Sequence, residues 1–401
     1  MFDAVFGPFF WGRLLATTGV WAYGLASALI AFQATSSTLT VGIVSAAQFI
    51  PQLLITPLSG NLTDRGHARA QILTGQVLCA VGCWFLAGWI AFAGLDTGNG
   101  VPIIVSSLIV GCGFAVGGSA MQSVVPWLVR PGELETAVAL NTIPMTLSRA
   151  VGPFVGAALL QTAGAEWTFA IAGLTQLAFG AGLLFVRVPR PRRSSTSADP
   201  RMRAALRRIR RDRPLAFLLL GVAAVGVGAE PAVTLVPVVS AQLTGSAAEL
   251  SGWLAASFGL GATLGLGLLA VRRGIFEVAR QGTSGLCLMG AGLITLGLSS
   301  VPAVSLCAFG LTGVGMTVSI NGLSTLIQQR APDEFRGRIM ALWLIAYVGS
   351  RPPAAALNGV VADHVGPSAA FLCSAGAVGL VALTVRPARV RRNPDRLDTF
   401  R

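Results

Sequence analysis

Long apolar segments alternate with short polar breaks along nearly the whole chain. Most segments reach the roughly 20 residues that an α-helix needs to cross the hydrocarbon core of a bilayer. The spacing therefore predicts an all-α polytopic membrane protein with twelve transmembrane helices. The predicted helices cover residues 9–34, 41–62, 70–93, 101–127, 135–162, 167–187, 214–240, 250–271, 281–300, 303–329, 338–362 and 368–385.

The composition supports a membrane protein and argues against a soluble one. Hydrophobic residues make up 53% of the 401 residues and charged residues only 11%, whereas a soluble domain carries about 25% charged residues. The net charge of +13 would suggest nucleic-acid binding in a soluble protein. Here most arginines lie in the breaks between apolar segments, so no nucleic-acid partner is expected. The segment 9–34 is too long for a signal-peptide core and is expected to remain as the first helix.

The arginines also orient the chain in the membrane. Alternate breaks contain arginine, as does the C-terminal tail. The other breaks contain no arginine, and their ionisable residues are acidic or histidine, such as Asp363 and His364. Positively charged loops stay on the cytoplasmic side. We therefore expect a multi-pass protein of the cell membrane with both termini in the cytoplasm.

The most basic break divides the chain into six helices and six. We expect an N-terminal six-helix bundle over residues 1–188, a basic cytoplasmic linker over 189–213, a C-terminal six-helix bundle over 214–386 and a basic cytoplasmic tail over 387–401.

Part of the linker has a helical pattern of its own. Met202, Ala205, Leu206 and Ile209 share one helical face, and arginines surround it. The pattern predicts a short helix on the anionic lipids of the inner leaflet. A solvated basic linker without helical structure is the alternative.

A sequence repeat relates the two halves. Ser148-Arg149 precedes Pro153 in the fifth predicted helix, and Ser350-Arg351 precedes Pro352 in the eleventh. A second pair of matching patterns consists of Gln33, Thr35, Ser37 and Gly42 and of Gln242, Thr244, Ser246 and Gly252. Two halves of equal orientation indicate a parallel repeat about an axis normal to the membrane. Transporters of this design bind their substrate between the halves near the midplane.

Three charged residues are predicted at similar depth inside the membrane: Arg149, Arg351 and Glu230. An arginine at the centre of a membrane helix costs roughly 2.5–3.5 kcal/mol on insertion scales, so such residues are functional candidates by default. Two interpretations are open. Glu230 either pairs permanently with one arginine as a strut, or it binds and releases protons while the arginines meet a polar or anionic substrate group. Two arginines against one glutamate favour acidic or neutral substrates over cations.

Further polar and aromatic residues of the apolar segments are candidates for the lining of a substrate cavity. Trp21, Tyr23 and Phe49 offer aromatic faces for planar ligands. The remaining candidates are amides: Gln48, Gln52, Gln122, Asn141, Asn321 and Asn358.

At two places the sequence resembles the major facilitator superfamily. The break Gly60-Asn61-Leu62-Thr63-Asp64-Arg65-Gly66-His67-Ala68-Arg69 is similar to the glycine, aspartate and basic loop of that superfamily. The resemblance implies that Gly60, Asp64, Arg65 and Arg69 form a cytoplasmic latch, with Asp64 facing a helix N-terminus of the other half. One feature departs from the family pattern: of the basic cluster that follows Arg65 in the family, only Arg69 is present here.

The fifth predicted helix contains the second resemblance, Ser148-Arg149-Ala150-Val151-Gly152-Pro153-Phe154-Val155-Gly156-Ala157. It is similar to the glycine–proline motif of the proton-coupled exporters, with Ser148 and Ala157 where glycine is usual. The resemblance implies a coupling role for Gly152, Pro153 and Gly156, while a bend that serves only packing is the alternative. The arginine motif that many proton antiporters carry in helix 4 is absent.

These features together look most like the exporter branch that includes siderophore exporters and macrolide efflux pumps. The resemblance implies export of a drug, siderophore or other secondary metabolite by proton antiport, with import of a small solute or a receptor role as alternatives. The chain has no ATP-binding loop, metal constellation or nucleophile–base pair, so we expect no cofactor and no enzymatic activity. We also expect a monomer.

Overall fold

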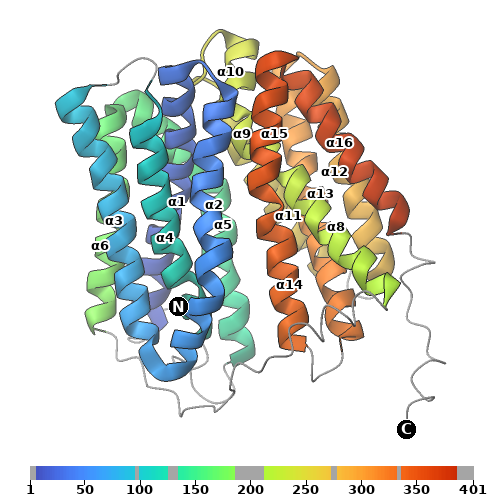
Figure 1. Cartoon of the computed structure of the whole chain (residues 1–401), viewed down its shortest axis with the longest axis horizontal. Coiled ribbons are helices and arrows are strands. Elements are labelled where there is room, and N and C mark those ends of the chain that lie inside the picture. Colours follow the sequence, from blue (N-terminus) through green and yellow to red (C-terminus); the bar gives the residue numbers. More distant parts are fainter. Residues whose placement is uncertain are drawn as a thin grey trace.

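The computed structural model of the protein describes residues 6–94, 99–124, 134–185, 212–271, 278–331 and 336–385, and within them all regular structure is helical (Figure 1). The first half contains α1 (Phe6–Thr35), α2 (Thr38–Leu62), the short π-helix η1 (Thr63–His67), α3 (Ala68–Ala93), α4 (Val101–Ser123), α5 (Leu134–Thr162) and α6 (Gly164–Phe185). The second half contains α8 (Arg213–Ala229), α9 (Pro231–Thr234), α10 (Val236–Thr244), α11 (Ser251–Val271), α12 (Val278–Leu298), α13 (Pro302–Arg330), α14 (Arg336–Gly349), α15 (Arg351–His364) and α16 (Pro367–Thr384).

The helices of each half stand side by side as a bundle, α1 to α6 in one and α8 to α16 in the other (Figure 1). Within the described residues, eleven helices are long and apolar enough to cross a membrane. The predicted all-α polytopic fold is confirmed. The predicted domain limits at 188/189 and 386/387 fall in residues that are not described, as does the predicted linker helix around Met202, whereas the limit at 213/214 lies at the start of α8.

Two predicted helices are not continuous. The segment 338–362 is divided into α14 and α15, each only 14 residues long, with a turn at Ser350. The segment 214–240 is divided at Glu230 and again at Leu235 into α8, α9 and α10. A proline closely follows each interruption. Proline interrupts a helix because it lacks an N–H donor and clashes with the preceding turn. The prediction of unbroken helices was therefore wrong at these two places, and α14 with α15 stands for the twelfth span.

The two bundles meet where small residues let the backbones approach. A Cβ atom on Gly259 of α11 would lie 2.6 Å from the backbone nitrogen of Ala150 in α5. Gly42 of α2 faces the backbone of Ala355 in α15 in the same way. The interface is thus centred on two helix pairs, α2 with α15 and α5 with α11, which the repeat relates.

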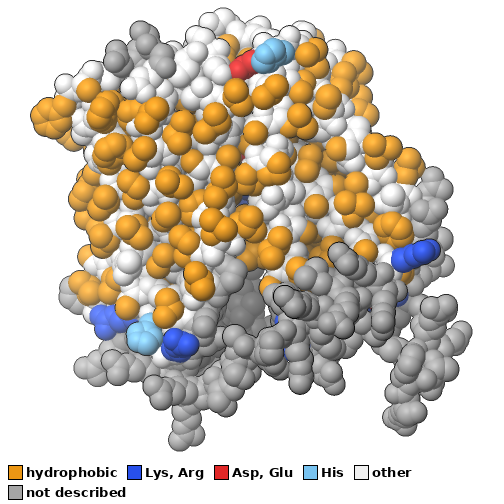
Figure 2. Space-filling view, in the orientation of Figure 1, with side chains coloured by type: hydrophobic (Ala, Val, Ile, Leu, Met, Phe, Trp, Pro, Cys, Tyr) orange, Lys and Arg blue, Asp and Glu red, His pale blue; other side chains and the backbone are white. Residues whose placement is uncertain are grey.

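The outer surface has the polarity that a bilayer requires. Hydrophobic side chains cover the middle of the face in Figure 2, and charged side chains gather toward its two ends. Large apolar residues such as Phe92, Leu264 and Leu380 are 95%, 68% and 69% exposed. We call the end that carries Arg65, Arg69 and Arg330 the arginine end and the opposite one the Asp363 end.

Candidate functional site

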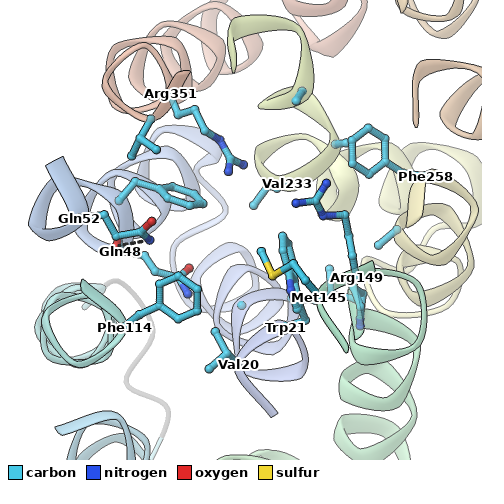
Figure 3. Close-up of a pocket in the computed structure, with 18 of the residues that line it drawn as sticks. Val20, Trp21, Gln48, Gln52, Phe114, Met145, Arg149, Val233, Phe258 and Arg351 are labelled. Carbon is cyan, nitrogen blue, oxygen red and sulfur yellow. Dashed lines mark hydrogen bonds between the residues drawn. The ribbon is translucent and has the colours of Figure 1, made fainter. Parts of the chain in front are cut away.

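A cavity lies between the bundles at the depth of the helix breaks (Figure 3). Its volume is about 140 Å³, measured over the positions that the centre of a water molecule can occupy. The lining is largely apolar, with two arginines and two glutamine side chains among the exceptions. Aromatic side chains come from both halves: Trp21, Phe49, Phe114, Phe258 and Tyr347. A concave apolar site with few polar groups has the character of a small-molecule site.

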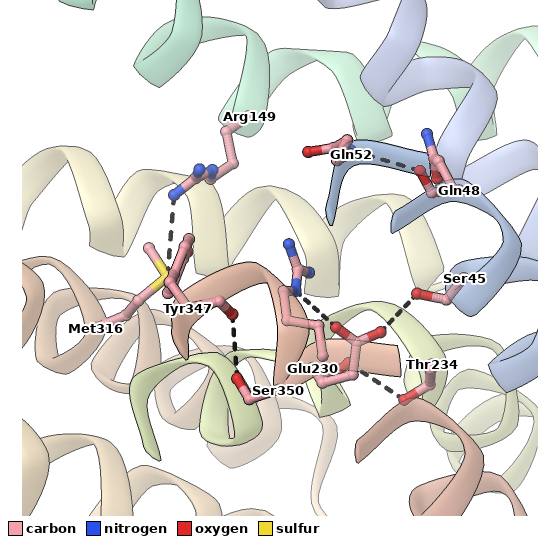
Figure 4. Close-up of polar contacts among 10 residues, drawn as sticks. Ser45, Gln48, Gln52, Arg149, Glu230, Thr234, Met316, Tyr347 and Ser350 are labelled. Carbon is pink, nitrogen blue, oxygen red and sulfur yellow. Dashed lines mark hydrogen bonds and ion pairs between the residues drawn. The ribbon is translucent and has the colours of Figure 1, made fainter. Parts of the chain in front are cut away.

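Glu230 lies beside this cavity and has no exposed surface. One carboxylate oxygen accepts a hydrogen bond from the Ser45 hydroxyl of α2 at 2.5 Å, and the other contacts Arg351 Nε at 2.7 Å (Figure 4). Ser45 belongs to the first bundle and Arg351 to the second. The carboxylate therefore joins the two halves of the protein.

The local backbone explains how two charges reach this depth. Glu230 ends α8 and Arg351 begins α15, and each is followed by proline. The Glu230 carbonyl accepts hydrogen bonds from the Val233 and Thr234 amides at 2.9 and 3.1 Å, so the break leaves this group satisfied. The Arg351 guanidinium stacks on the Phe49 ring with 3.8 Å between its carbon and the ring centroid. Pairing and stacking together offset the cost of burying both charges.

Arg149 has a different environment. Among the described residues, its one recorded hydrogen bond is from Nη1 to the Met316 sulfur at 3.9 Å, and its Nε is enclosed without a hydrogen-bond partner. The guanidinium carbon lies 5.2 Å from the centroid of the Trp21 ring. Gly152 lets α5 approach α1 here, because a Cβ on it would lie 2.5 Å from Trp21 Cβ. Arg149 and Arg351 both point into the cavity (Figure 3).

Several other predicted residues line the cavity, and some do not. Trp21, Gln48, Gln52 and Pro153 line it. Gly156, like Gly152, packs α5 closely against the backbone of Ala22 in α1.

The remaining amides lie elsewhere. Gln122 is exposed and is not among the lining residues. The Asn321 amide donates to the Thr317 carbonyl of its own helix at 2.8 Å, and the Asn358 oxygen accepts from Ser374 of α16 at 3.0 Å. The side chain of Asn141 lies outside the described residues.

The predicted cytoplasmic latch can be followed only in part. The surroundings of Gly60 and the side chain of Asp64 are not described. Arg65 is exposed, and Arg69 donates to the Leu184 carbonyl at 2.8 Å, which keeps it within the first bundle.

A connection that sequence reasoning missed closes the Asp363 end. Asp363 at the end of α15 accepts hydrogen bonds from the Thr38 and Leu39 amides at 2.6 and 3.0 Å and from the Ser37 hydroxyl at 2.7 Å. These amides are unpaired donors at the start of α2, where the helix dipole also favours an anion. Partial burial raises the pKa of Asp363, but these hydrogen bonds outweigh it and hold the pKa below its ordinary value of 3.8.

The repeat supplies the counterpart on the other helix pair. Gln161 near the end of α5 donates to the Ala248 carbonyl, just before α11, at 2.9 Å. Gln161 and Asp363 have the same separation in sequence as Arg149 and Arg351, namely 202 positions. The sequence alone does not show which helix ends meet, and without that information neither contact, at Asp363 or at Gln161, could be predicted.

Replacing Asp363 by alanine is expected to loosen the Asp363 end. The distance between spin labels at Asn99→Cys and Val365→Cys, in a background without native cysteines, reports this opening. Loss of a helix-capping group costs about 1 kcal/mol, so the population with the longer distance should increase about fivefold. The control is Glu249→Ala, since Glu249 is exposed at the same end.

The pH dependence of this closure follows from the lowered pKa of Asp363. A carboxyl whose folded pKa is lowered stabilises above its ordinary pKa and loses that effect as the pH falls through the folded value. The contribution of Asp363 to closure, measured as the difference between the unsubstituted protein and Asp363→Ala, should therefore be the same at pH 5 and pH 8. A contribution that changes between these values, or an equal effect of Glu249→Ala, would show that Asp363 is not the closing group.

Comparison with known proteins agrees with this architecture. Residues 2–398 match the model of a family described as transmembrane secretion effector, a family of the major facilitator superfamily. The chain belongs to this family. It is therefore a multi-pass membrane transporter and not an enzyme.

Relatives of known name match along most of their length. The enterobactin exporter EntS of Shigella boydii is 27% identical over 405 residues, covering 95% of this chain and 90% of the relative. An uncharacterized transporter of the superfamily, YfiS of Bacillus subtilis, is 25% identical over 404 residues, covering 92% and 90%.

Solved structures show the same fold at low sequence identity. The nucleoside transporter NupG gives a TM-score of 0.77 at 11% identity, covering 96% of this chain and 98% of that one. A bacterial homologue of the iron transporter ferroportin, in an inward-facing state, gives 0.75 at 15% identity, covering 98% and 100%.

Proposed function

We propose that this transporter exports a small molecule by alternating access and that inward movement of protons drives the export. The observation that carries the proposal is the Glu230–Arg351 pair, which is buried beside the cavity and contacts both bundles. The relatives that export enterobactin support the outward direction. A secondary metabolite, siderophore or drug is the proposed class of cargo.

The position of the pair links proton binding to the movement of the bundles. Separation of α2 from α15 removes Ser45 from Glu230 and opens a path for water to the carboxylate. A proton taken up from the outside then neutralises Glu230 and frees Arg351. After the opposite movement the proton leaves toward the inside, and the ion pair forms again. The described structure, with the pair intact and the Asp363 end closed, corresponds to the state after proton release.

The direction of this cycle depends on the orientation in the membrane, and we propose that the arginine end is cytoplasmic. Ser246→Cys should react with an impermeant maleimide in intact cells, whereas Arg65→Cys should react only after permeabilisation, because both side chains are exposed at opposite ends. The test uses a background without native cysteines. The reverse labelling pattern would contradict the assignment and would also reverse the proposed direction of transport.

Everted membrane vesicles test the proposed function itself. With enterobactin and a macrolide as probes, we expect accumulation of at least one in vesicles with an acidic interior and loss of accumulation when an ionophore collapses the pH gradient. Accumulation that survives the collapse would contradict proton coupling. Uptake by right-side-out vesicles alone would indicate an importer, and the absence of any flux of these probes in both preparations would count against export of this class of cargo.

A further inference from the structure

We propose that Arg149 forms an anion-binding subsite in the cavity and that the transported molecule carries an acidic group on a planar aromatic ring. This inference rests on the proposed function, because it names the class of substrate that the cavity takes. Its basis is the unequal environment of the two arginines that the sequence repeat places at equivalent positions.

The repeat explains why one arginine has a counter-ion and the other lacks one. Gln33 and Gln242 correspond in the two halves and differ by 209 positions, and Trp21 and Glu230 differ by the same number. A tryptophan in the first bundle therefore stands where the second bundle has its glutamate. Arg351 pairs with Glu230 at 2.7 Å, whereas the guanidinium of Arg149 lies 5.2 Å from the centroid of the Trp21 ring.

The aromatic ring holds the guanidinium without satisfying it. An arginine side chain has five N–H donors, and those of Arg149 meet among the described residues only the sulfur of Met316, a weak acceptor, while Nε has no partner. No carboxylate of the described residues forms an ion pair with Arg149. A half-buried charge that has no counter-ion among the described residues attracts an incoming anion, and two or more unused donors can bind it.

The shape of the cavity limits the rest of the ligand. A cavity of about 140 Å³ has room for one aromatic ring with an acidic substituent, and a larger molecule would place one such group here. Phe258 and Val233 supply apolar walls near the guanidinium groups of Arg149 and Arg351, and Phe114 lies across the cavity toward Val20 (Figure 3).

The anion and the proton are thus received by different groups. Arg149 receives the anion, while Glu230 has its own contacts with Ser45 and Arg351. A ligand at Arg149 does not need to displace the carboxylate. In an antiport cycle the two are then taken up on opposite sides of the membrane instead of competing for one side chain.

The test is equilibrium binding of three small aromatic probes of similar size and different charge. Benzoate, benzamide and benzylammonium are titrated against the purified full-length protein by ligand-observed NMR, without a pH gradient. We expect benzoate to bind at least about tenfold more tightly than benzamide, as for a hydrogen-bonded charge, and benzylammonium to bind most weakly. Arg149→Gln should remove the preference for benzoate, and Arg149→Lys should keep a reduced preference.

A matched control removes the same charge elsewhere. Arg330→Gln at the arginine end, where Arg330 pairs with Asp212 at 2.9 Å, should leave the order of the probes unchanged. Equal binding of benzoate and benzamide by the unsubstituted protein, or an unchanged preference in a folded Arg149→Gln protein, would overturn the subsite. Because no gradient is applied, such a failure is independent of whether protons drive transport, which the vesicle experiment decides.

Discussion

Replacement of Arg351 by alanine is expected to lower the free energy of unfolding by about 3–5 kcal/mol, as for removal of one partner from a buried ion pair. The side chains of Arg351 and Glu230 are 9% and 0% exposed, so water cannot solvate the carboxylate that is left behind. Only the Ser45 hydroxyl would still contact it. The measurement is denaturant- or heat-induced unfolding of the purified protein in detergent.

Two further variants separate loss of the ion pair from loss of packing. Arg351→Ala combined with Glu230→Gln should recover most of the lost stability, because the double variant leaves no buried charge without a partner. Arg149→Ala should cost less than Arg351→Ala, since Arg149 has no carboxylate partner among the described residues. If the double variant were as unstable as Arg351→Ala alone, packing of the arginine on Phe49 would be the reason for its presence.

Glu230→Gln is expected to abolish gradient-driven transport in a protein that still folds, with a lower stability because Arg351 loses its counter-ion. Glutamine has nearly the shape of glutamate: its oxygen can accept the hydrogen bond from Arg351, and its amide N–H can donate to the Ser45 hydroxyl. It cannot bind and release a proton, so the bundles lose the group that joins proton uptake to their movement. The expected fall in driven transport is complete, whereas substrate binding at Arg149 should change little because that site has separate contacts.

Much of the fold could be predicted because hydrophobic segments of membrane length are unambiguous in this chain. The breaks in two helices were not predicted, although Pro231 and Pro352 directly follow Glu230 and Arg351 there. The positions of Glu230, Arg149 and Arg351 along their segments predicted one depth for all three; in the structure the two arginines line the cavity and Glu230 contacts Arg351 beside it. Depth alone could not decide which arginine pairs with the glutamate, because the answer depends on helix rotation and on the local geometry of the breaks.

The same limit explains the amides that lie away from the cavity. A helix completes one turn every 3.6 residues, so two residues along it correspond to about half a turn. An error of that size in the predicted orientation of a helix moves Asn321 or Asn358 from the cavity side to a neighbouring helix. Asp363 illustrates a different limit. In the sequence it indicates only the side of the membrane, whereas its function as a cap depends on where the end of α15 meets the start of α2.

The central claim, that Glu230 couples protons to transport, is tested most directly in proteoliposomes. Two rates are measured for the unsubstituted protein and for Glu230→Gln, using a probe that the former transports in vesicles: uptake driven by a pH gradient, and exchange of labelled for unlabelled probe at equal pH. We predict that Glu230→Gln loses the driven uptake and retains the exchange. Driven uptake by Glu230→Gln at the unsubstituted rate, with unaltered pH dependence, would contradict the claim and leave Glu230 as a structural partner of Arg351.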